Sequence, residues 1–226
     1  MKSNKVNRSA AEAGFNRPPI QIILVGAGNH GFPAYVQDAF PPLIASGKIQ
    51  VTGVIEPDSA ALDRALKALG LSSSSGFADL KPALKQLSAE ALVIASPYAA
   101  HEEACMLGIE HGLQLFIEKP VCGDLRACCR VAQAVQKAGR KAAVNMSARF
   151  EVEKQDFTTS IHRGVIGRVD YIFARLAWDH SSAARSRSRT PHPYLMEAGV
   201  HFLDLLRICA VGRPLRVHNL AWKTVE

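Results

Sequence analysis

The chain contains 226 residues and carries a formal net charge of +7; 48% of the residues are apolar and 21% are charged. This length and composition are typical of a globular protein with one domain of ordinary size and part of a second. No apolar run approaches the ~20 residues that span a bilayer, so no membrane partner is expected. The polar segment 1–19 lacks the apolar centre of a signal peptide and is predicted to be a flexible leader.

The positive charge does not predict a nucleic-acid partner. Part of it lies in the leader, and part lies in a Ser/Arg segment that contains Arg185, Arg187 and Arg189. No aromatic residues are interleaved with these arginines, and no DNA- or RNA-reading motif accompanies them. Two interpretations of this segment are consistent with its sequence: a solvated loop, or a loop that closes over an anionic ligand. Five cysteines without a CxxC pair predict reduced thiols, a cytoplasmic protein and no structural metal site.

Short apolar strands alternate with helical patterns through the first two thirds of the chain, which predicts a doubly wound parallel α/β sheet of the Rossmann type over residues 20–146. Strands are expected at 20–25, 49–55, from Phe77, 91–95, 114–117 and 142–145. Helices are expected at 30–45, 59–69, 79–87, 100–111 and 124–139. Their start and stop signals are Asp58, Asp79, Gly112, Asp124 and Gly139.

The pattern changes after this domain, which predicts a second domain over residues 147–226. Helices are expected at 147–161 and 194–210, and strands at 169–178 and 215–225. Because a two-stranded sheet is marginal by itself, this domain is predicted to be incomplete. Its last strand would present an unpaired edge and an uncovered apolar face, so we expect a homo-oligomer that associates through this sheet.

A glycine-rich turn follows the first predicted strand and opens the first helix. Its sequence is Gly26-Ala-Gly28-Asn29-His30-Gly31. Gly26 permits a tight turn, Gly28 lets the backbone approach a pyrophosphate, and Gly31 lets the helix pack close to the strand. Amides at the start of the helix would bind the phosphates. A glycine turn without a ligand is the alternative interpretation.

Two further polar sites follow predicted strands of the same sheet. Glu56 ends the second strand, where a carboxylate binds the adenosine ribose hydroxyls and repels the 2′-phosphate of NADP, so NAD is favoured over NADP. The alternative for Glu56 is a carboxylate that starts the next helix. Ser96-Pro97-x-x-x-His101 follows the fourth strand beside the same crevice. Its histidine is expected either to contact the cofactor or to be a polar residue in the first helical turn.

The motif Glu118-Lys119-Pro120 closes the fifth predicted strand, at the position where a nicotinamide ring would lie, so Glu118 is expected to contact the cofactor. There the lysine would hydrogen-bond the substrate oxygen and stabilise its developing negative charge. Glu197 and His201 are four residues apart, so on a helix they share a face and the carboxylate can orient the imidazole as a general base. A pair on the helix surface is the alternative. Asn145 and Arg149, at or just past the sixth strand, are expected substrate contacts.

Taken in chain order, these motifs resemble the glucose–fructose oxidoreductase / inositol dehydrogenase / rhizopine-catabolism (Gfo/Idh/MocA) family. The resemblance implies a Rossmann domain followed by a domain with an open, mostly antiparallel sheet. It implies NAD(P)-dependent oxidation or reduction of a sugar, a cyclic polyol or a related carbonyl compound. Lys119 matches the family's catalytic lysine, and His201 matches the histidine of its Asp-x-x-x-His motif. Glu197 stands where the family usually has aspartate, and members usually continue with several more strands.

Three functions are open at this point. The first is an NAD-dependent sugar or polyol dehydrogenase with Lys119, His201 and Glu197 as catalytic residues. The second is a non-catalytic dinucleotide-binding sensor, or a partner subunit of a longer relative. The third is a carbonyl or imine reductase that uses the same residues in the opposite direction. The sequence does not define the small-molecule substrate.

Overall fold

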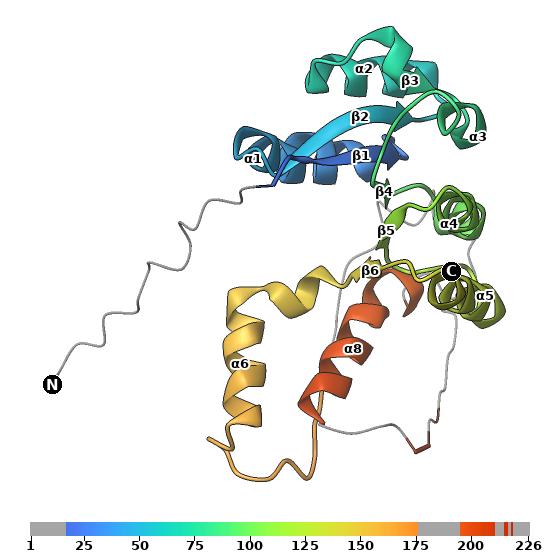
Figure 1. Cartoon of the computed structure of the whole chain (residues 1–226). Coiled ribbons are helices and arrows are strands. Elements are labelled where there is room, and N and C mark those ends of the chain that lie inside the picture. Colours follow the sequence, from blue (N-terminus) through green and yellow to red (C-terminus); the bar gives the residue numbers. More distant parts are fainter. Residues whose placement is uncertain (1–16, 176–194, 211–214, 217, 219–226) are drawn as a thin grey trace, which may run out of the picture. The chain divides into compact units, whose positions relative to one another are not determined.

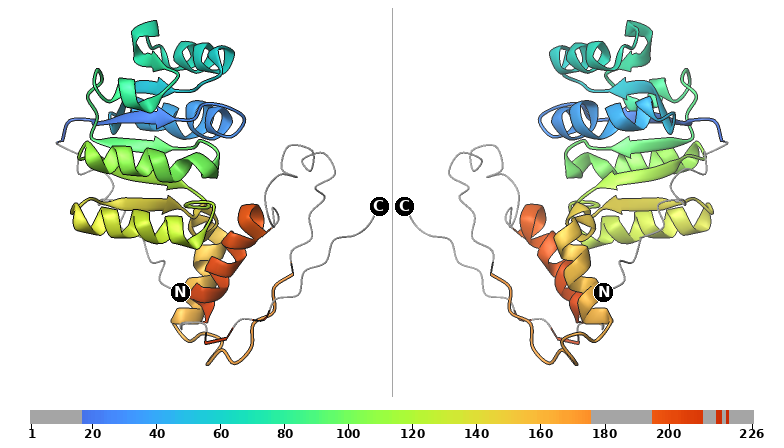
Figure 2. Two further views of the ribbon diagram at one scale, coloured as in Figure 1. Left: turned by 90° about the vertical axis from the view of Figure 1, so that its right-hand side faces the viewer. Right: turned by 90° about the vertical axis from the view of Figure 1, so that its left-hand side faces the viewer.

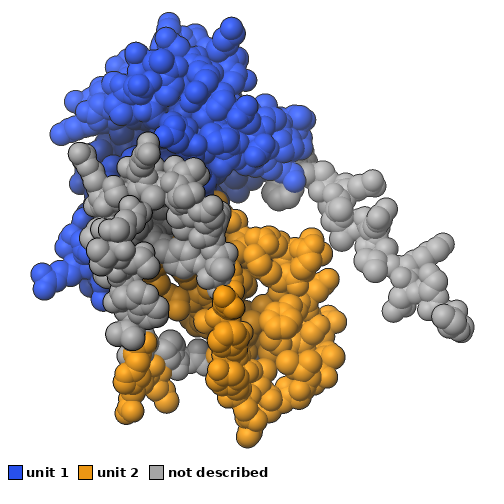
Figure 3. Space-filling model, turned by 180° about the vertical axis from the view of Figure 1, so that it is seen from behind, with its two compact units in different colours: residues 1–144 blue, residues 145–226 orange. Residues whose placement is uncertain are grey.

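The computed structural model describes residues 17–175, 195–210, 215–216 and 218 (Figure 1). It divides into two compact units, residues 1–144 and 145–226, which Figure 3 colours separately. None of the helices in these described ranges is long and apolar enough to cross a membrane.

The first unit is built on a six-stranded sheet with the strand order β3-β2-β1-β4-β5-β6. The strands are β1 (Ile20–Val25), β2 (Ile49–Ile55), β3 (Gly76–Phe77), β4 (Ala91–Ile94), β5 (Gln114–Glu118) and β6 (Ala142–Asn145). β1 pairs in parallel with both β2 and β4, and β4 pairs in parallel with β5. The strand order therefore reverses between β1 and β4, and this is the point where doubly wound folds bind their ligands. The predicted Rossmann sheet is confirmed.

Helices connect these strands. They are α2 (Ser59–Leu69), α3 (Leu80–Ala83), α4 (His101–Glu110) and α5 (Leu125–Lys137), with short 3-10 turns η3 (Ser73–Ser75) and η4 (Tyr98–Ala100). The side chains of Asp58, Asp79 and Asp124 cap three of them by accepting backbone amide hydrogens. The third predicted helix is shorter than the expected 79–87, because the amides after Ala83 donate to carbonyls three residues back as often as four.

The helix after the glycine turn consists of two segments. A π-helical segment, η2 (Phe32–Ala39), precedes α1 (Phe40–Ala45), where one continuous helix over 30–45 was expected. The Phe40 amide donates to the Tyr35 carbonyl five residues earlier. Pro41 and Pro42 follow and have no amide hydrogen, so the regular four-residue ladder cannot start within this stretch.

Both faces of the sheet are buried beneath helices (Figure 2). Ile22 and Leu24 belong to one core cluster with residues of η2, α1 and α2, whereas Ile23 and Val25 belong to a second cluster with residues of α3, α4 and α5. This alternation explains why the strands are apolar at consecutive positions rather than at every second one.

The second unit contains η5 (Ser147–Phe150), α6 (Val152–His162), η6 (Leu195–Gly199) and α8 (Val200–Cys209). α6 and α8 lie side by side (Figures 1 and 2), and the His162 Nε2 atom lies 2.9 Å from the Ile208 carbonyl oxygen.

The strand predicted over 169–178 is wrong for its described part, because residues 169–175 form no strand. The Tyr171 and Phe173 side chains in that stretch are 82% and 74% exposed, so no neighbouring strand covers them. Residues 176–178, and nearly all of the strand predicted over 215–225, lie outside the described residues. The expected antiparallel sheet is therefore not found in the described part of the chain.

Candidate active site

The glycine turn packs directly against the end of β4. Gly26 has a φ of +94°, and a Cβ atom added to it would lie 2.4 Å from the Ser96 backbone nitrogen. A Cβ atom on Gly31 would lie 2.0 Å from the Gly26 carbonyl oxygen. Both positions therefore require glycine, for the tight turn and for the close packing that the motif predicts.

The middle of the turn is open instead. Among the described residues, a Cβ atom on Gly28 would find a single neighbour within 4 Å, the Glu56 Oε2 atom at 3.5 Å. Asn29 and His30 follow, and in the described part of the chain no side chain caps η2, whose N-cap residue is Gly31. Space above a backbone turn and an uncapped helix N-terminus fit the phosphates of a dinucleotide.

Glu56 lies against this turn and is buried. Its Oε2 atom accepts a hydrogen bond from the Ala27 amide at 2.9 Å, and Oε1 accepts one from the Asp58 amide at 3.1 Å. Asp58 itself caps α2, so Glu56 is not needed for that purpose. The structure thus places the carboxylate beside Gly28, and its binding to the adenosine ribose stays a prediction.

The His101 side chain lies between the loop that follows β4 and the loop that follows β5. Its ring is 1% exposed. The Nε2 atom lies 2.7 Å from the Ser96 carbonyl oxygen, and Nδ1 lies 3.1 Å from that of Pro120 and 3.2 Å from that of Val121. His101 begins α4, and both of its ring nitrogens lie against backbone carbonyls, so this geometry favours a polar residue in the first helical turn over a cofactor contact.

Ser96 follows β4 and carries a hydroxyl group that faces the interior of the protein. Its Oγ atom is buried and makes no hydrogen bond to the described residues. Pro97, which follows it, is exposed. A buried polar atom without a partner costs free energy, so a ligand that supplied one would be bound more tightly. This serine therefore also fits a cofactor in the crevice.

Glu118 ends β5 as a buried carboxylate. Its Oε1 atom accepts a hydrogen bond from the Tyr35 hydroxyl at 2.7 Å and lies 3.1 Å from the His30 Nε2 atom. Its Oε2 atom accepts one from the Lys119 amide at 3.0 Å. Sequence reasoning assigned Glu118 to cofactor binding and missed Tyr35. The signal was a tyrosine in the first turns after the glycine motif.

The second unit carries the remaining predicted residues. His201 lies in α8, and Glu197 lies in η6, four residues earlier. Asn145 ends β6. Arg149 does not stand alone: its guanidinium forms a bidentate ion pair with Asp204, and Arg207 lies near the same carboxylate. Asp204 was not predicted. It lies three residues after His201, at helical spacing.

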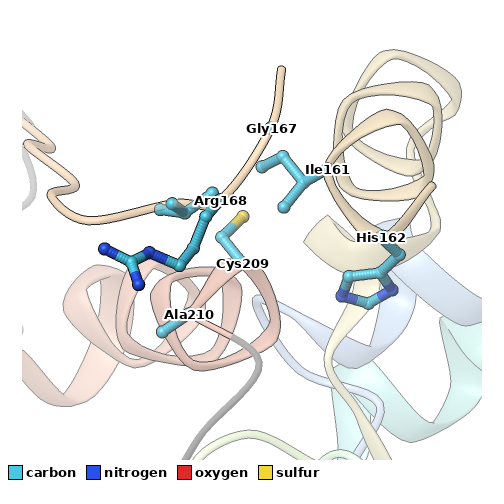
Figure 4. A pocket seen from close by; sticks show the side chains of 7 residues that line it. Ile161, His162, Gly167, Arg168, Cys209 and Ala210 are labelled. Carbon is cyan, nitrogen blue, oxygen red and sulfur yellow. The ribbon is translucent and has the colours of Figure 1, made fainter. Parts of the chain in front are cut away.

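A shallow pocket of the second unit holds none of the predicted site residues (Figure 4). It is lined by Ile161, His162, Gly167, Arg168, Val169, Cys209 and Ala210. The Arg168 guanidinium in this pocket pairs with Asp170 at 2.9 Å, so this charge is already neutralised.

Two thiols of the first unit, those of Cys105 and Cys122, are buried. Burial raises the pKa of Cys105 and of Cys122 to about 12, so both are protonated near neutral pH. The described residues contain no group of three or more His, Cys, Asp or Glu side chains that could hold a metal ion.

The comparisons with known proteins agree with this fold. A family model described as "Oxidoreductase family, NAD-binding Rossmann fold" (Gfo/Idh/MocA) matches residues 20–146. The uncharacterized protein y4oX of Sinorhizobium fredii is 31% identical over 206 residues, which are 90% of this chain and 57% of that protein. Inositol 2-dehydrogenase 4 of Saccharopolyspora erythraea is 26% identical over 193 residues, 83% of this chain and 53% of that one. The chain spans about half the length of these relatives.

Solved structures share the fold. Scyllo-inositol dehydrogenase from Lactobacillus casei with bound NAD(H) and scyllo-inositol has a TM-score of 0.73 at 21% identity, over 85% of this chain and 56% of that one. The WlbA dehydrogenase from Bordetella pertussis, in complex with NADH and UDP-GlcNAcA, has a TM-score of 0.69 at 24% identity, over 84% and 58%. With the glycine turn and the Glu118-Lys119 strand end in place, the chain belongs to the Gfo/Idh/MocA oxidoreductase family, and its first unit is the NAD-binding Rossmann fold of that family.

Proposed function

We propose that the protein transfers a hydride between the nicotinamide of NAD and a sugar, a cyclic polyol or a related carbonyl compound. The observation that carries this proposal is the position of Lys119. It follows β5, the second strand beyond the reversal of strand order at β1 and β4, with its backbone held by Glu118. A cation at this edge of the sheet lies where the reacting end of a dinucleotide is expected.

The first unit offers the groups that would hold NAD. The turn at Gly28, Asn29 and His30 would bind the pyrophosphate, Glu56 the adenosine ribose, and Ser96 the part of the cofactor that crosses the end of β4. Because the Glu56 carboxylate lies at the turn, it disfavours the extra phosphate of NADP. When bound, NAD supplies the hydride acceptor and NADH the hydride donor.

The chain's own residues would move the proton. The Lys119 ammonium donates a hydrogen bond to the reacting oxygen and stabilises negative charge on it. His201 accepts the hydroxyl proton as the hydride leaves the same carbon, and returns it in the reverse direction. Glu197, four residues before His201, orients the imidazole and stabilises its charged form. Asn145 would be a further substrate contact.

The partner is therefore a small polyhydroxylated molecule. The inositol 2-dehydrogenase among the relatives makes inositols the first substrates to test. A homo-oligomer formed through the second unit is part of the same proposal, since apolar side chains of α6 and α8 such as Phe157 and Leu203 are exposed.

The decisive experiment separates binding from turnover. NADH and NADPH are titrated against the chain by fluorescence, and NAD reduction is followed with myo-inositol, scyllo-inositol and simple sugars. We expect tighter binding of NADH than of NADPH. Lys119→Ala should abolish turnover and leave the NADH dissociation constant within about threefold, because its main partner is the reacting oxygen. NADH binding without turnover on any polyol would instead favour a dinucleotide sensor, and loss of NADH binding in Lys119→Ala would make the lysine a cofactor anchor.

A further inference from the structure

Glu118 is a buried carboxylate to which two separate parts of the first unit donate. The residue is 4% exposed, and a carboxylate at that depth needs hydrogen-bond donors to offset its desolvation. The Tyr35 hydroxyl and the His30 ring reach it from the region of the glycine turn, and the Lys119 amide reaches it from its own strand end. The turn expected to hold the pyrophosphate and the residue expected to hold the substrate therefore meet at one side chain.

Tyr35 is held rigidly in this arrangement. Its ring is 5% exposed and packs against the rings of Phe40 and Phe116, with centroid distances of 5.6 Å and 6.3 Å. The His30 ring meets it edge-on at 6.4 Å. A phenol fixed on three sides can direct its hydroxyl at one acceptor at little entropic cost.

The acceptor in turn controls the backbone at Lys119. Glu118 Oε2 accepts the amide hydrogen of the next residue, which sets the orientation of the peptide plane between Glu118 and Lys119. The Lys119 Cα atom lies in this plane, so the orientation of the plane affects the direction of the Lys119 side chain. Removing the Tyr35 hydroxyl would leave the buried carboxylate with one donor fewer and would free it to rotate away from the Lys119 amide.

We propose that Tyr35 is a positioning residue for Lys119 that acts through Glu118, and that His30 links the same carboxylate to the cofactor-binding turn. The inference rests on the proposed function of Lys119. It assigns Glu118 a role between the two sites in place of the direct cofactor contact that the sequence predicted.

Hydrogen exchange of the Lys119 amide, measured by NMR, tests the inference without requiring turnover. We expect Tyr35→Phe to accelerate exchange at Lys119 about tenfold, because its acceptor is no longer held. Exchange at Ile23 and Leu24, in the core of β1, should stay within about twofold, which separates repositioning from general unfolding. The NADH dissociation constant should stay within about threefold, and kcat on any polyol that is turned over should fall about tenfold.

Two comparisons make the result specific. Tyr171→Phe removes the same hydroxyl from a side chain that is 82% exposed, and it should change none of these quantities. In a Glu118→Gln background, Tyr35→Phe should add little, because the two residues act in series. Unchanged Lys119 exchange in Tyr35→Phe, or an equal increase in both backgrounds, would overturn the inference while native NADH binding stands. Absence of NADH binding by the unsubstituted chain would overturn the proposed function itself.

Discussion

The two units differ in how completely they bury their own apolar side chains. In the first unit, Ile23, Leu24 and Leu92 are fully buried between two layers of helices. In the second, Phe150, Phe157 and Leu203 remain 64%, 59% and 56% exposed. The first unit therefore forms a complete core, whereas the described part of the second does not. The comparison indicates that the first unit can fold and bind its cofactor by itself, whereas the second unit needs contacts beyond its described residues.

The largest effect is expected when the two units are produced as separate proteins and their unfolding is compared. We expect residues 1–146 alone to unfold in a single cooperative urea transition and to retain NADH binding within about threefold. Residues 147–226 alone should show no cooperative transition, because too little of their apolar surface is buried. Circular dichroism during urea titration measures both. A cooperative transition in the second segment would show that its core is more complete than its described side chains indicate.

The second test examines the closest packing in the first unit. Gly31→Ala would force a Cβ atom to 2.0 Å from the Gly26 carbonyl, so we expect a loss of about 3 kcal/mol in unfolding free energy and loss of NADH binding. Gly139→Ala is the matched control. Its φ is +63° and no described residue lies within 4 Å of the added atom, so the substitution should cost only about 1 kcal/mol and leave binding intact. Equal losses in urea denaturation would argue against close packing at the turn.

The third test concerns the ion pair of the second unit. Arg149 and Asp204 join η5 to α8, and Arg149→Ala should lower the unfolding free energy by about 1.5 kcal/mol. Once Asp204 is replaced by Asn, the same substitution should cost little. Arg168→Ala, at a side chain that is 87% exposed, is the control and should be nearly neutral. If Arg149→Ala raised the KM for a substrate without loss of stability, the result would support the substrate contact that the sequence predicted for Arg149.

The smallest effect is expected from the exposed charges of the first unit. The Arg130 guanidinium, hydrogen-bonded to Glu102, holds the pKa of that carboxyl below its usual value of 4.5. A lowered folded pKa contributes stability above the unfolded value, and this contribution is lost as the pH falls through the folded value. The small deficit in stability of Arg130→Ala should therefore be present at pH 7 and be lost as the pH falls below 4.5, through the lowered pKa of the folded state. A deficit independent of pH would point to lost packing of the arginine stem instead.

Local sequence patterns were sufficient for most of the first unit. The strands at Ile20–Val25, Ile49–Ile55 and Ala142–Asn145 have the predicted bounds, because each is mostly apolar and is flanked by turn residues. Asp58 and Asp124 cap helices as expected, and Gly139 takes a positive φ after the last turn of α5. Each of these features depends on residues within a few positions of one another.

Contacts between distant residues could not be predicted in this way. Tyr35 and Glu118 are 83 positions apart, and only the folded sheet brings them together. The same holds for the burial of His101, which sequence spacing left open. The stretch 169–175 shows the opposite error: its residues suit a strand, but a strand also needs a partner, and the described residues provide none.

The position of His101 between two loops has a consequence for engineering this protein. Because one imidazole lies within hydrogen-bond distance of carbonyl oxygens of Ser96 and Pro120, the loops after β4 and β5 share a single anchor. If one of these loops were replaced by that of a relative to change the substrate preference, the imidazole could no longer contact both loops in the same geometry. Chimeras should therefore exchange both loops together with the histidine, and libraries that randomise either loop should keep residue 101 unchanged.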